Sequence, residues 1–334
     1  MTDSGKNILV TGGGGFLGSA IVRKLLDQGH RVSSFSRSRH PHLDDWDVEQ
    51  LVGDVLDAVT VATAIKGRDA VFHVAAKTGV WGDEQEYTGV NVTGTHNVIA
   101  GCQFGGVPLL IHTSSPSVVF NGTDMAGVDE SVPYPSLYTA PYPKTKAVAE
   151  RAVRKAASPR LLTLSLRPHL IWGPGDNHLV PRIIKKAKKL RQVGDGTNQV
   201  DTTYIDNAAL AHVQAMVALE KSPELSGRVY FISDDAPVRL WDMINRILEA
   251  AGKPPVERQM TPKTACLIGD IAEWVYRRFN IRHEPPMTRF VAQELSTSHW
   301  FNISAAKQDL GYRPEVSIDQ GMARLASWLQ DSHA

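Results

Sequence analysis

The sequence predicts an α/β fold in which a parallel sheet is covered by helices on both faces. Short apolar runs, such as residues 8–10 and 109–113, alternate with helical patterns, such as residues 19–28 and 143–157. This alternation favours crossover connections and therefore parallel strands. The chain has 334 residues, of which 42% are hydrophobic and 21% charged, so it has enough apolar material for a substantial core.

The first half of the chain carries most of the expected elements. Each expected strand is a short apolar run, and the helical patterns repeat apolar residues at helical spacing, as Ile21, Val22 and Leu25 show. In chain order, we expect strands at residues 8–10, 31–35, 50–52, 69–74, 109–113 and 161–166, with helices at residues 19–28, 58–65, 90–102 and 143–157.

The pattern becomes looser after Trp172, where a glycine- and proline-rich loop begins. Helices are expected at residues 181–190 and 241–251, and one apolar run near 228–232 returns the chain to the sheet. We therefore predict a sheet domain over residues 1–172. Residues 173–334 should form a smaller mixed domain, most of it devoted to substrate binding.

Charge and cysteine content narrow the class of protein. The 36 Lys and Arg residues against 35 Asp and Glu residues give a net charge of +1, which provides no global field for nucleic acid or an anionic membrane, so either would need a local patch. Cys102 and Cys266 cannot form a disulfide framework. We expect a cytoplasmic protein, with no secretory signal and no apolar stretch near the roughly 20 residues of a transmembrane helix.

Glycines between the first strand and the first helix predict a dinucleotide site. Residues 11–18 read Thr-Gly-Gly-Gly-Gly-Phe-Leu-Gly. Gly12 permits a sharp turn, Gly15 lets backbone N–H groups approach a pyrophosphate, and Gly18 lets helix and strand pack closely. This context makes residues 1–172 a Rossmann-type domain, with Phe16 and Leu17 beside the cofactor.

The end of the second strand favours NADP(H) over NAD. An NAD site usually carries an acidic side chain there, whereas this chain has Ser36 and Arg37, which suit a 2′-phosphate. Asp54 and Val55 follow the next strand. Asp54 either accepts from the adenine amino group or caps the following helix.

Tyr142 and Lys146 are the candidate catalytic pair. Tyr142 stands at a helix start, and Lys146 follows four residues later. In a helix, this spacing places the two side chains on one face. A nearby ammonium lowers a tyrosine pKa from its usual value near ~10, which favours proton exchange with a carbonyl oxygen. Ser114 and Ser115 end the 109–113 strand, where a hydroxyl would hold the same oxygen.

Together these motifs resemble the extended short-chain dehydrogenase/reductase family. Residues 140–143 and 311–314 are similar to its 3β-hydroxysteroid dehydrogenase-like branch. The resemblance implies that Tyr142 is the general acid/base and Lys146 its pKa partner and ribose anchor. It places the substrate hydroxyl at Ser115, with Ser114 as the alternative. It also implies cofactor contacts at Ala75, Ala76, Lys77, Asn91, Thr113 and Pro168.

Within that branch, residues 113–118, 170–176 and 200–207 resemble bacterial reductases of long-chain olefin biosynthesis. This implies NADPH-dependent reduction of a hydrophobic 2-alkyl-3-oxo acid to its 3-hydroxy acid, beside a β-lactone synthetase and a β-lactone decarboxylase. We expect a homodimer. The alternatives are a 3β-hydroxysteroid-type dehydrogenase, a nucleotide-sugar epimerase that would need an acid at position 36, and a non-catalytic NADP sensor.

Further features leave two surface questions open. The basic run at residues 182–191 is a solvated helix face or a docking surface. The apolar pattern at residues 265–279 is a buried stripe or an interfacial helix, so peripheral membrane contact stays open. Trp81 and Tyr204 are candidate pocket residues. No metal site is expected, since no histidine or carboxylate pair at ligand spacing follows His40 and His42.

Overall fold

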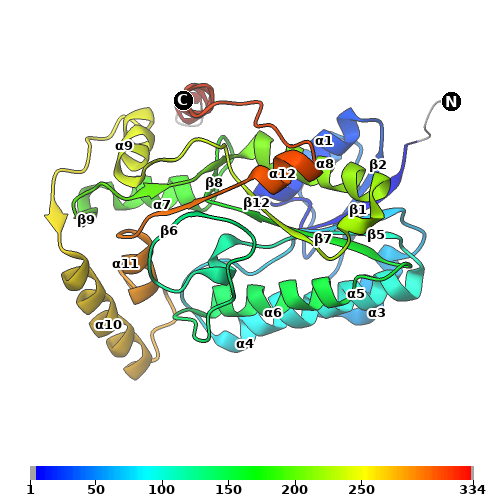
Figure 1. Ribbon diagram of the computed structural model, residues 1–334, viewed down its shortest axis with the longest axis horizontal. Helices are drawn as coiled ribbons and strands as arrows, with labels where there is room; N and C mark the ends of the chain where they lie inside the picture. The colour runs from blue at the N-terminus through cyan, green and yellow to red at the C-terminus, as the bar shows by residue number, and fades with distance from the viewer. Residues whose placement is uncertain (1–4, 332–334) are drawn as a thin grey trace.

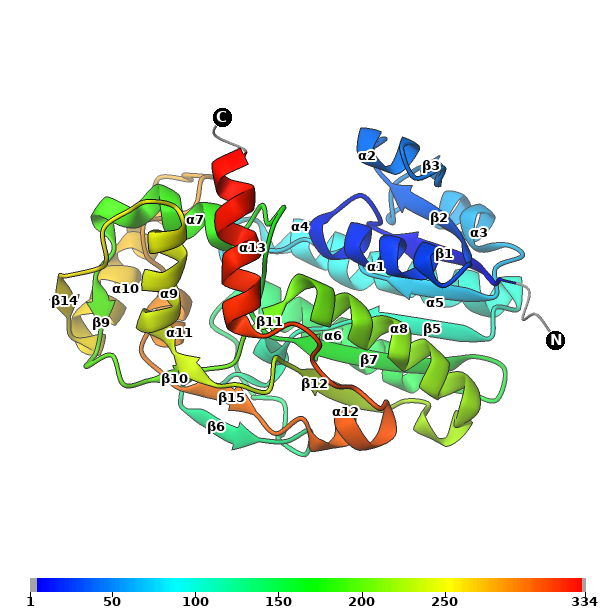
Figure 2. The same cartoon turned by 90° about the horizontal axis from the view of Figure 1, so that it is seen from above.

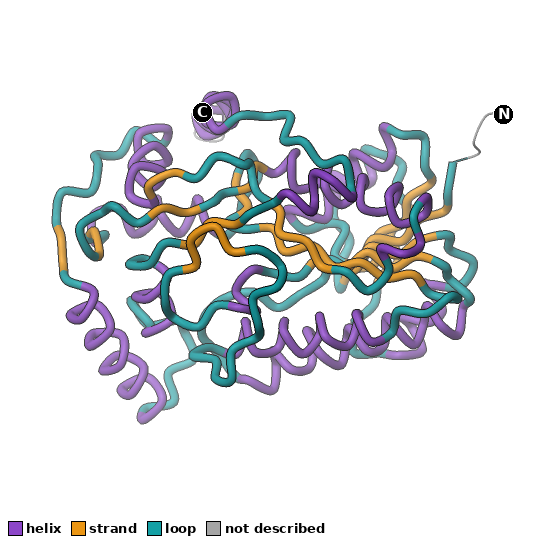
Figure 3. Tube along the Cα trace, in the orientation of Figure 1, coloured by secondary structure: helices purple, strands orange, loops and turns teal. Residues whose placement is uncertain are grey.

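A seven-stranded parallel sheet forms the centre of the computed structural model, which describes residues 5–331 (Figures 1 and 3). The strand order is β3-β2-β1-β4-β5-β7-β12, so the chain winds outward in both directions from β1 and β4. This confirms the predicted doubly wound fold class. The strands are β1 Asn7–Thr11, β2 Arg31–Ser36, β3 Glu49–Val52, β4 Ala70–His73, β5 Leu109–Thr113, β7 Leu162–Pro168 and β12 Val229–Ile232.

Helices cover both faces of this sheet (Figure 1). On one face, α1 (Phe16–Asp27) packs against α8 (Ile205–Lys221). On the other lie α3 (Ala58–Ile65), α5 (Gly94–Gly105) and α6 (Pro141–Lys155). Their sequences explain the helices: α1 buries the apolar stripe that includes Ile21 and Val22, Asp57 caps α3, and a proline lies in the first turn of α6.

The second half of the chain builds a smaller mixed layer at one end of the sheet (Figure 2). Its four-stranded sheet has the order β13-β10-β15-β6 and takes β6 from the first half of the chain. The strands are β6 Met125–Val128, β10 Gln199–Val200, β13 Val238–Arg239 and β15 His299–Phe301. The main helices are α7 Leu179–Lys186, α9 Leu240–Ala250, α10 Pro262–Arg278, α11 Arg289–Glu294, α12 Ser304–Asp309 and α13 Ile318–Asp331.

Small elements complete the fold. They are α2 Pro41–Asp44, α4 Glu84–Tyr87, β8 Ile171–Trp172, β9 Gln192–Val193, β11 Thr203–Tyr204 and β14 Gln259–Met260. Short helical turns at Thr88–Thr93, Pro116–Val119, Ala187–Lys189 and Pro223–Leu225 join longer elements. No helix among the described residues is long and apolar enough to span a membrane.

The helix α8 was missing from the sequence-based prediction. It buries side chains on most of its circumference, so it lacks the one-sided stripe that marks an amphipathic helix. The chain also returns to the main sheet at β12, which pairs with β7 from Val229↔Ser165 onward. The two halves of the sequence therefore exchange elements, and the boundary at residue 172 stays a prediction.

Candidate active site

A cleft of about 1120 Å³ lies at the carboxyl ends of the central strands. Ligands of doubly wound folds bind at this edge, because the chain leaves the sheet in opposite directions on the two sides of the switch point. Most of the predicted site residues meet here. They are Gly12, Gly15, Phe16, Leu17, Gly18, Ser36, Arg37, Asp54, Val55, Ala75, Ala76, Lys77, Thr113, Ser114, Ser115, Tyr142, Lys146 and Pro168.

The glycine turn after β1 has the geometry that a pyrophosphate needs. Gly12 has a φ of 71°, and its N–H donates to the Phe35 carbonyl at 2.8 Å. A Cβ on Gly18 would lie 2.0 Å from the Gly12 oxygen, so a side chain there would force α1 away from β1. No side chain caps the first turn of α1, which leaves its N–H groups for an anion.

The end of β2 carries an unsatisfied hydroxyl beside a cation. The Ser36 Oγ is buried and has no hydrogen-bond partner among the described residues. Arg37 is exposed and forms no ion pair within residues 5–331, whereas Arg39 pairs with Asp44 at 2.6 Å. A 2′-phosphate would accept hydrogen bonds from both Ser36 and Arg37, so this part of the cleft fits NADP(H).

Of two other predicted cofactor residues, Asp54 lines the cleft and Asn91 does not. Asp54 lines it and accepts from the Leu56 N–H at 3.0 Å. Asp57 is the cap of α3, so the capping role considered for Asp54 is wrong. Asn91 is buried behind the wall, where its Oδ1 accepts from the Lys77 N–H at 2.7 Å. It thus positions the backbone of the wall without lining the cleft.

Tyr142 and Ser115 come together from two elements. Ser115 follows β5, and its Oγ lies 2.9 Å from the Ser117 Oγ, while Tyr142 lies in the first turn of α6. Burial raises the pKa of Tyr142, and its hydrogen bond with Ser115 offsets part of the rise. The expected lowering by Lys146 is therefore wrong for this structure, because burial dominates. Tyr142 keeps its proton at neutral pH, as a proton donor must.

Lys146 lies one helical turn further along α6 and is only 4% exposed. Its Nζ donates to the Thr113 carbonyl at 2.5 Å and lies 3.3 Å from the His112 Nε2. Burial holds the pKa of His112 well below its usual value, so the imidazole is neutral. Burial also lowers the pKa of Lys146 to about 8, against an opposing effect of Glu150. The ammonium is therefore charged at pH 7.

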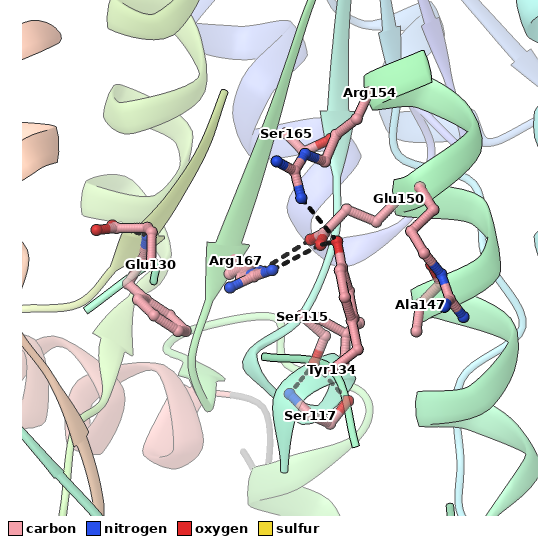
Figure 4. A network of polar contacts seen from close by, with 12 residues as sticks. Ser115, Ser117, Glu130, Tyr134, Ala147, Glu150, Arg154, Ser165 and Arg167 are labelled. Atoms are coloured by element: carbon pink, nitrogen blue, oxygen red, sulfur yellow. Dashed lines mark hydrogen bonds and ion pairs between the residues drawn. The ribbon is translucent and has the colours of Figure 1, made fainter. Parts of the chain in front are cut away.

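A buried ion pair joins Glu150 to Arg167 (Figure 4). Glu150, another turn along α6, accepts from Arg167 Nε and Nη2 at 2.9 and 2.7 Å, and from the Tyr134 hydroxyl. Burial opposes ionisation, yet the bonds from Arg167 and Tyr134 hold the pKa of Glu150 below its usual value. The Ser114 Oγ is buried and has no hydrogen-bond partner among the described residues, whereas the Ser115 hydroxyl affects the pKa of Tyr142.

The second half of the chain contributes cleft residues that the sequence did not predict. Among them, Glu294 at the end of α11 has no side-chain hydrogen bond or ion pair with any described residue. Burial raises its pKa, and its carboxyl in turn raises the pKa of Tyr142. No motif marks this residue. The other unpredicted residues from this half include His169, Leu170, Ile171, Asp176, His178, Leu179, Arg182, Glu284 and Phe290.

Trp81 and Tyr204, predicted as pocket residues, do not line this cleft. The Trp81 Nε1 donates to the Ile281 carbonyl at 3.3 Å, and its ring contacts Tyr276. Tyr204 is buried against Trp172 and borders a separate cavity behind the glycine turn. The pocket role predicted for both residues depends on their positions in loops, and a loop position carries no information about the direction of a side chain.

Residues 9–262 match the family model described as the 3-beta hydroxysteroid dehydrogenase/isomerase family. The chain belongs to this family. It is an oxidoreductase of the kind that interconverts CH–OH and C=O groups. The match covers the glycine turn, Tyr142 and Lys146, and it stops at the first residue of α10.

Individual relatives show a narrower likeness. The chain is 48% identical over 323 residues to the 2-alkyl-3-oxoalkanoate reductase of Stenotrophomonas maltophilia (strain K279a), covering 95% of this chain and 98% of that protein. It is 47% identical over 330 residues to the protein of the same name from Shewanella oneidensis, with 96% and 85% covered. The solved structure of MoeE5 in complex with UDP-glucose and NAD shares the fold, with a TM-score of 0.76, 23% identity, and 98% and 100% covered.

Proposed function

We propose that the protein is an NADP(H)-dependent ketoreductase that reduces a long-chain 2-alkyl-3-oxoalkanoate to the 2-alkyl-3-hydroxyalkanoate. The observation that carries this proposal is the convergence of Tyr142, Ser115 and Lys146 in the cleft that also contains the glycine turn. The names of the two bacterial relatives support the substrate class. Leu170, Ile171 and Phe290 also line the cleft, and their apolar side chains would suit an alkyl chain.

The cofactor-binding and catalytic residues have separate roles in the proposed reaction. When bound, the nicotinamide would supply a hydride to the C3 carbonyl carbon. The glycine turn would hold the pyrophosphate, Ser36 and Arg37 the 2′-phosphate, and Lys146 the ribose. Tyr142 donates its phenolic proton to the carbonyl oxygen, which Ser115 holds by a hydrogen bond. Lys146 is assigned the ribose alone, because burial and not its ammonium sets the direction of the Tyr142 pKa shift.

A 3β-hydroxysteroid-type dehydrogenase is the second candidate, since the matching family model is described by that substrate class. The same three catalytic residues would serve it. The two candidates differ in the shape of the substrate, so activity against chosen substrates separates them.

The test follows NADPH and NADH oxidation by the purified protein with a long 2-alkyl-3-oxo acid, a 3-ketosteroid and a short 3-oxo ester. We expect turnover of the long keto acid, and faster turnover with NADPH than with NADH. Turnover of the steroid alone would keep the catalytic residues and overturn the substrate. Tight NADPH binding without any turnover would overturn the ketoreductase proposal itself.

A further inference from the structure

The outer face of α10 is apolar and has no cover from the rest of the described chain. On its inner side the helix packs closely on α11, where a Cβ on Gly269 would lie 2.6 Å from the Arg289 nitrogen. Of the eleven large hydrophobic side chains that are exposed within residues 5–331, five belong to this face. These five form the outer stripe: Leu267, Ile268, Ile271, Trp274 and Phe279, which are 58%, 42%, 54%, 66% and 68% exposed.

Both acidic groups of α10 are already paired. Asp270 forms an ion pair with Arg289, and Glu273 pairs with Arg277 at 2.8 Å while also accepting from the Arg289 N–H. The apolar stripe therefore has no free carboxylate beside it.

Most of the charges that remain unpaired around the outer stripe are positive, with exposed Glu257 ahead of β14 as the exception. Lys263, Arg278 and Arg282 form no ion pair with any described residue, and the Arg278 guanidinium lies over the Phe279 ring at 5.9 Å. A second basic segment adjoins the start of α10. The strand β9, which follows exposed Lys188, Lys189 and Arg191, pairs with β14 directly before the helix.

The helix α10 also lies beside the candidate active site, although the outer stripe faces away from it. At the carboxyl end of α10, Tyr276 contacts the Trp81 ring, and residues 78–80 just before Trp81 line the cleft. On the inner side of α10, Phe290 and Glu294 of α11 line the same cleft. Figures 1 and 2 show α10 at the end of the molecule opposite β2 and β3, with its outer side facing away from the main sheet.

We propose that α10 is an interfacial helix that adsorbs on an anionic lipid bilayer. The outer stripe would enter the boundary between headgroups and acyl chains, and Lys263, Arg278 and Arg282 would contact the anionic headgroups. Tryptophan and arginine suit this depth, because each joins an apolar body to a polar end. Adsorption would bring the cleft to the surface where long-chain molecules reside.

A second copy of the chain fits this face less well. Neither Asp270 nor Glu273 is free to meet a cation, so two outer stripes packed around a two-fold axis would bring unpaired cations together without countercharges. An anionic bilayer supplies the missing negative charge.

The test is sedimentation of the full-length protein with phosphatidylcholine vesicles, with or without phosphatidylglycerol. We expect binding to the anionic vesicles that weakens with added salt. Ile271→Ser combined with Trp274→Ser should lower the partition coefficient by roughly tenfold or more, because two side chains lose their apolar burial. Arg278→Glu should also lower it. Phe104→Ser, at a 90% exposed side chain on α5, is the matched control and should leave binding unchanged.

Three results would overturn the proposal. They are no binding to anionic vesicles, an equal loss in Phe104→Ser, and a double variant that dissociates a dimer in sedimentation velocity while vesicle binding persists. Thermal unfolding at the wild-type temperature would show that each variant is folded. The assay contains neither substrate nor cofactor, so its outcome is independent of the ketoreductase proposal.

Discussion

The proposed reduction depends on the phenolic proton of Tyr142. Burial and the Glu294 carboxyl both raise the pKa of the phenol, which therefore stays protonated across the neutral range. Reduction needs this protonated form, whereas the reverse oxidation needs the phenolate. Raising the pH should therefore favour oxidation over reduction.

Replacing Tyr142 by phenylalanine removes that proton without removing the ring. We expect Tyr142→Phe to lower the kcat for keto-acid reduction by roughly 100-fold or more, while cofactor affinity stays near that of the wild type. Steady-state kinetics and NADPH titration measure the two effects. Tyr138→Phe is the control, because that hydroxyl donates to the Val118 carbonyl at 2.9 Å outside the cleft. Equal losses in both variants would contradict the assigned role.

Arg37 should select the cofactor through the 2′-phosphate. Arg37→Ser removes a charged donor, so we expect the Kd for NADPH to rise roughly tenfold or more while the Kd for NADH changes little. Calorimetric titration with both nucleotides checks this. Arg39→Ser is the matched control, since Arg39 pairs with Asp44 and does not line the cleft. An unchanged NADPH affinity in Arg37→Ser would contradict the NADP(H) assignment.

At the scale of the element, α6 organises the catalytic groups. Tyr142, Lys146 and Glu150 follow at intervals of four residues, so one helix face carries the phenol, the ammonium and the carboxylate. The sequence predicted the first two. Glu150 went unnoticed because its role depends on Arg167 of β7, a contact between elements that no local pattern reports.

The turn between β1 and α1 is the second decisive element, and it depends on close backbone packing. A Cβ in Gly18→Ala would meet the Gly12 oxygen at 2.0 Å, so α1 must move. We expect a loss of about 1–3 kcal/mol in the free energy of unfolding, and weaker NADPH binding. Urea denaturation and nucleotide titration measure both.

Gly105→Ala provides the control for that variant. A Cβ on Gly105, at the end of α5, would have ordinary contacts no closer than 3.6 Å. We expect unchanged or slightly higher stability, because alanine favours a helix. A similar response in the two variants would refute the close-packing argument.

At the scale of the whole molecule, the two sheets are joined by strands that cross between the halves of the chain. Asp201 follows β10 in the smaller sheet and ties it to β15: its N–H donates to the His299 carbonyl at 3.0 Å, and its Oδ2 accepts from the Phe301 N–H at 2.8 Å. Burial raises the pKa of this carboxyl to about 7, and Asp234 and Asp235 add to the rise.

The pH dependence of stability follows from that shift. The folded state holds the Asp201 proton more tightly than the unfolded state, so stability falls as the pH rises from the usual value of 3.8 to about 7. Asp201→Asn removes this titration and keeps an acceptor for Phe301. We expect the unfolding free energy of Asp201→Asn, relative to that of the wild type, to increase by on the order of 2 kcal/mol from pH 5 to pH 8.

Urea denaturation at the two pH values checks this prediction. Asp195→Asn is the control, because hydrogen bonds from the Thr197 N–H and hydroxyl hold the Asp195 pKa below its usual value, outside this pH range. A constant difference between Asp201→Asn and the wild type would show that the carboxyl does not titrate with folding.

The sequence by itself determined the α/β class, the glycine turn, the Ser36-Arg37 end of β2 and the serine and tyrosine that meet in the cleft. Each depends on spacing within one segment, and the topology of a parallel sheet then gathers strand ends at one edge. Tertiary structure alone decided the pairing of β6 with β15, the position of Glu294, and the placement of Trp81 and Tyr204 outside the cleft. It also left the α10 stripe exposed. These features depend on contacts between residues far apart in the chain, and a periodic pattern does not report which face of an element finds a partner.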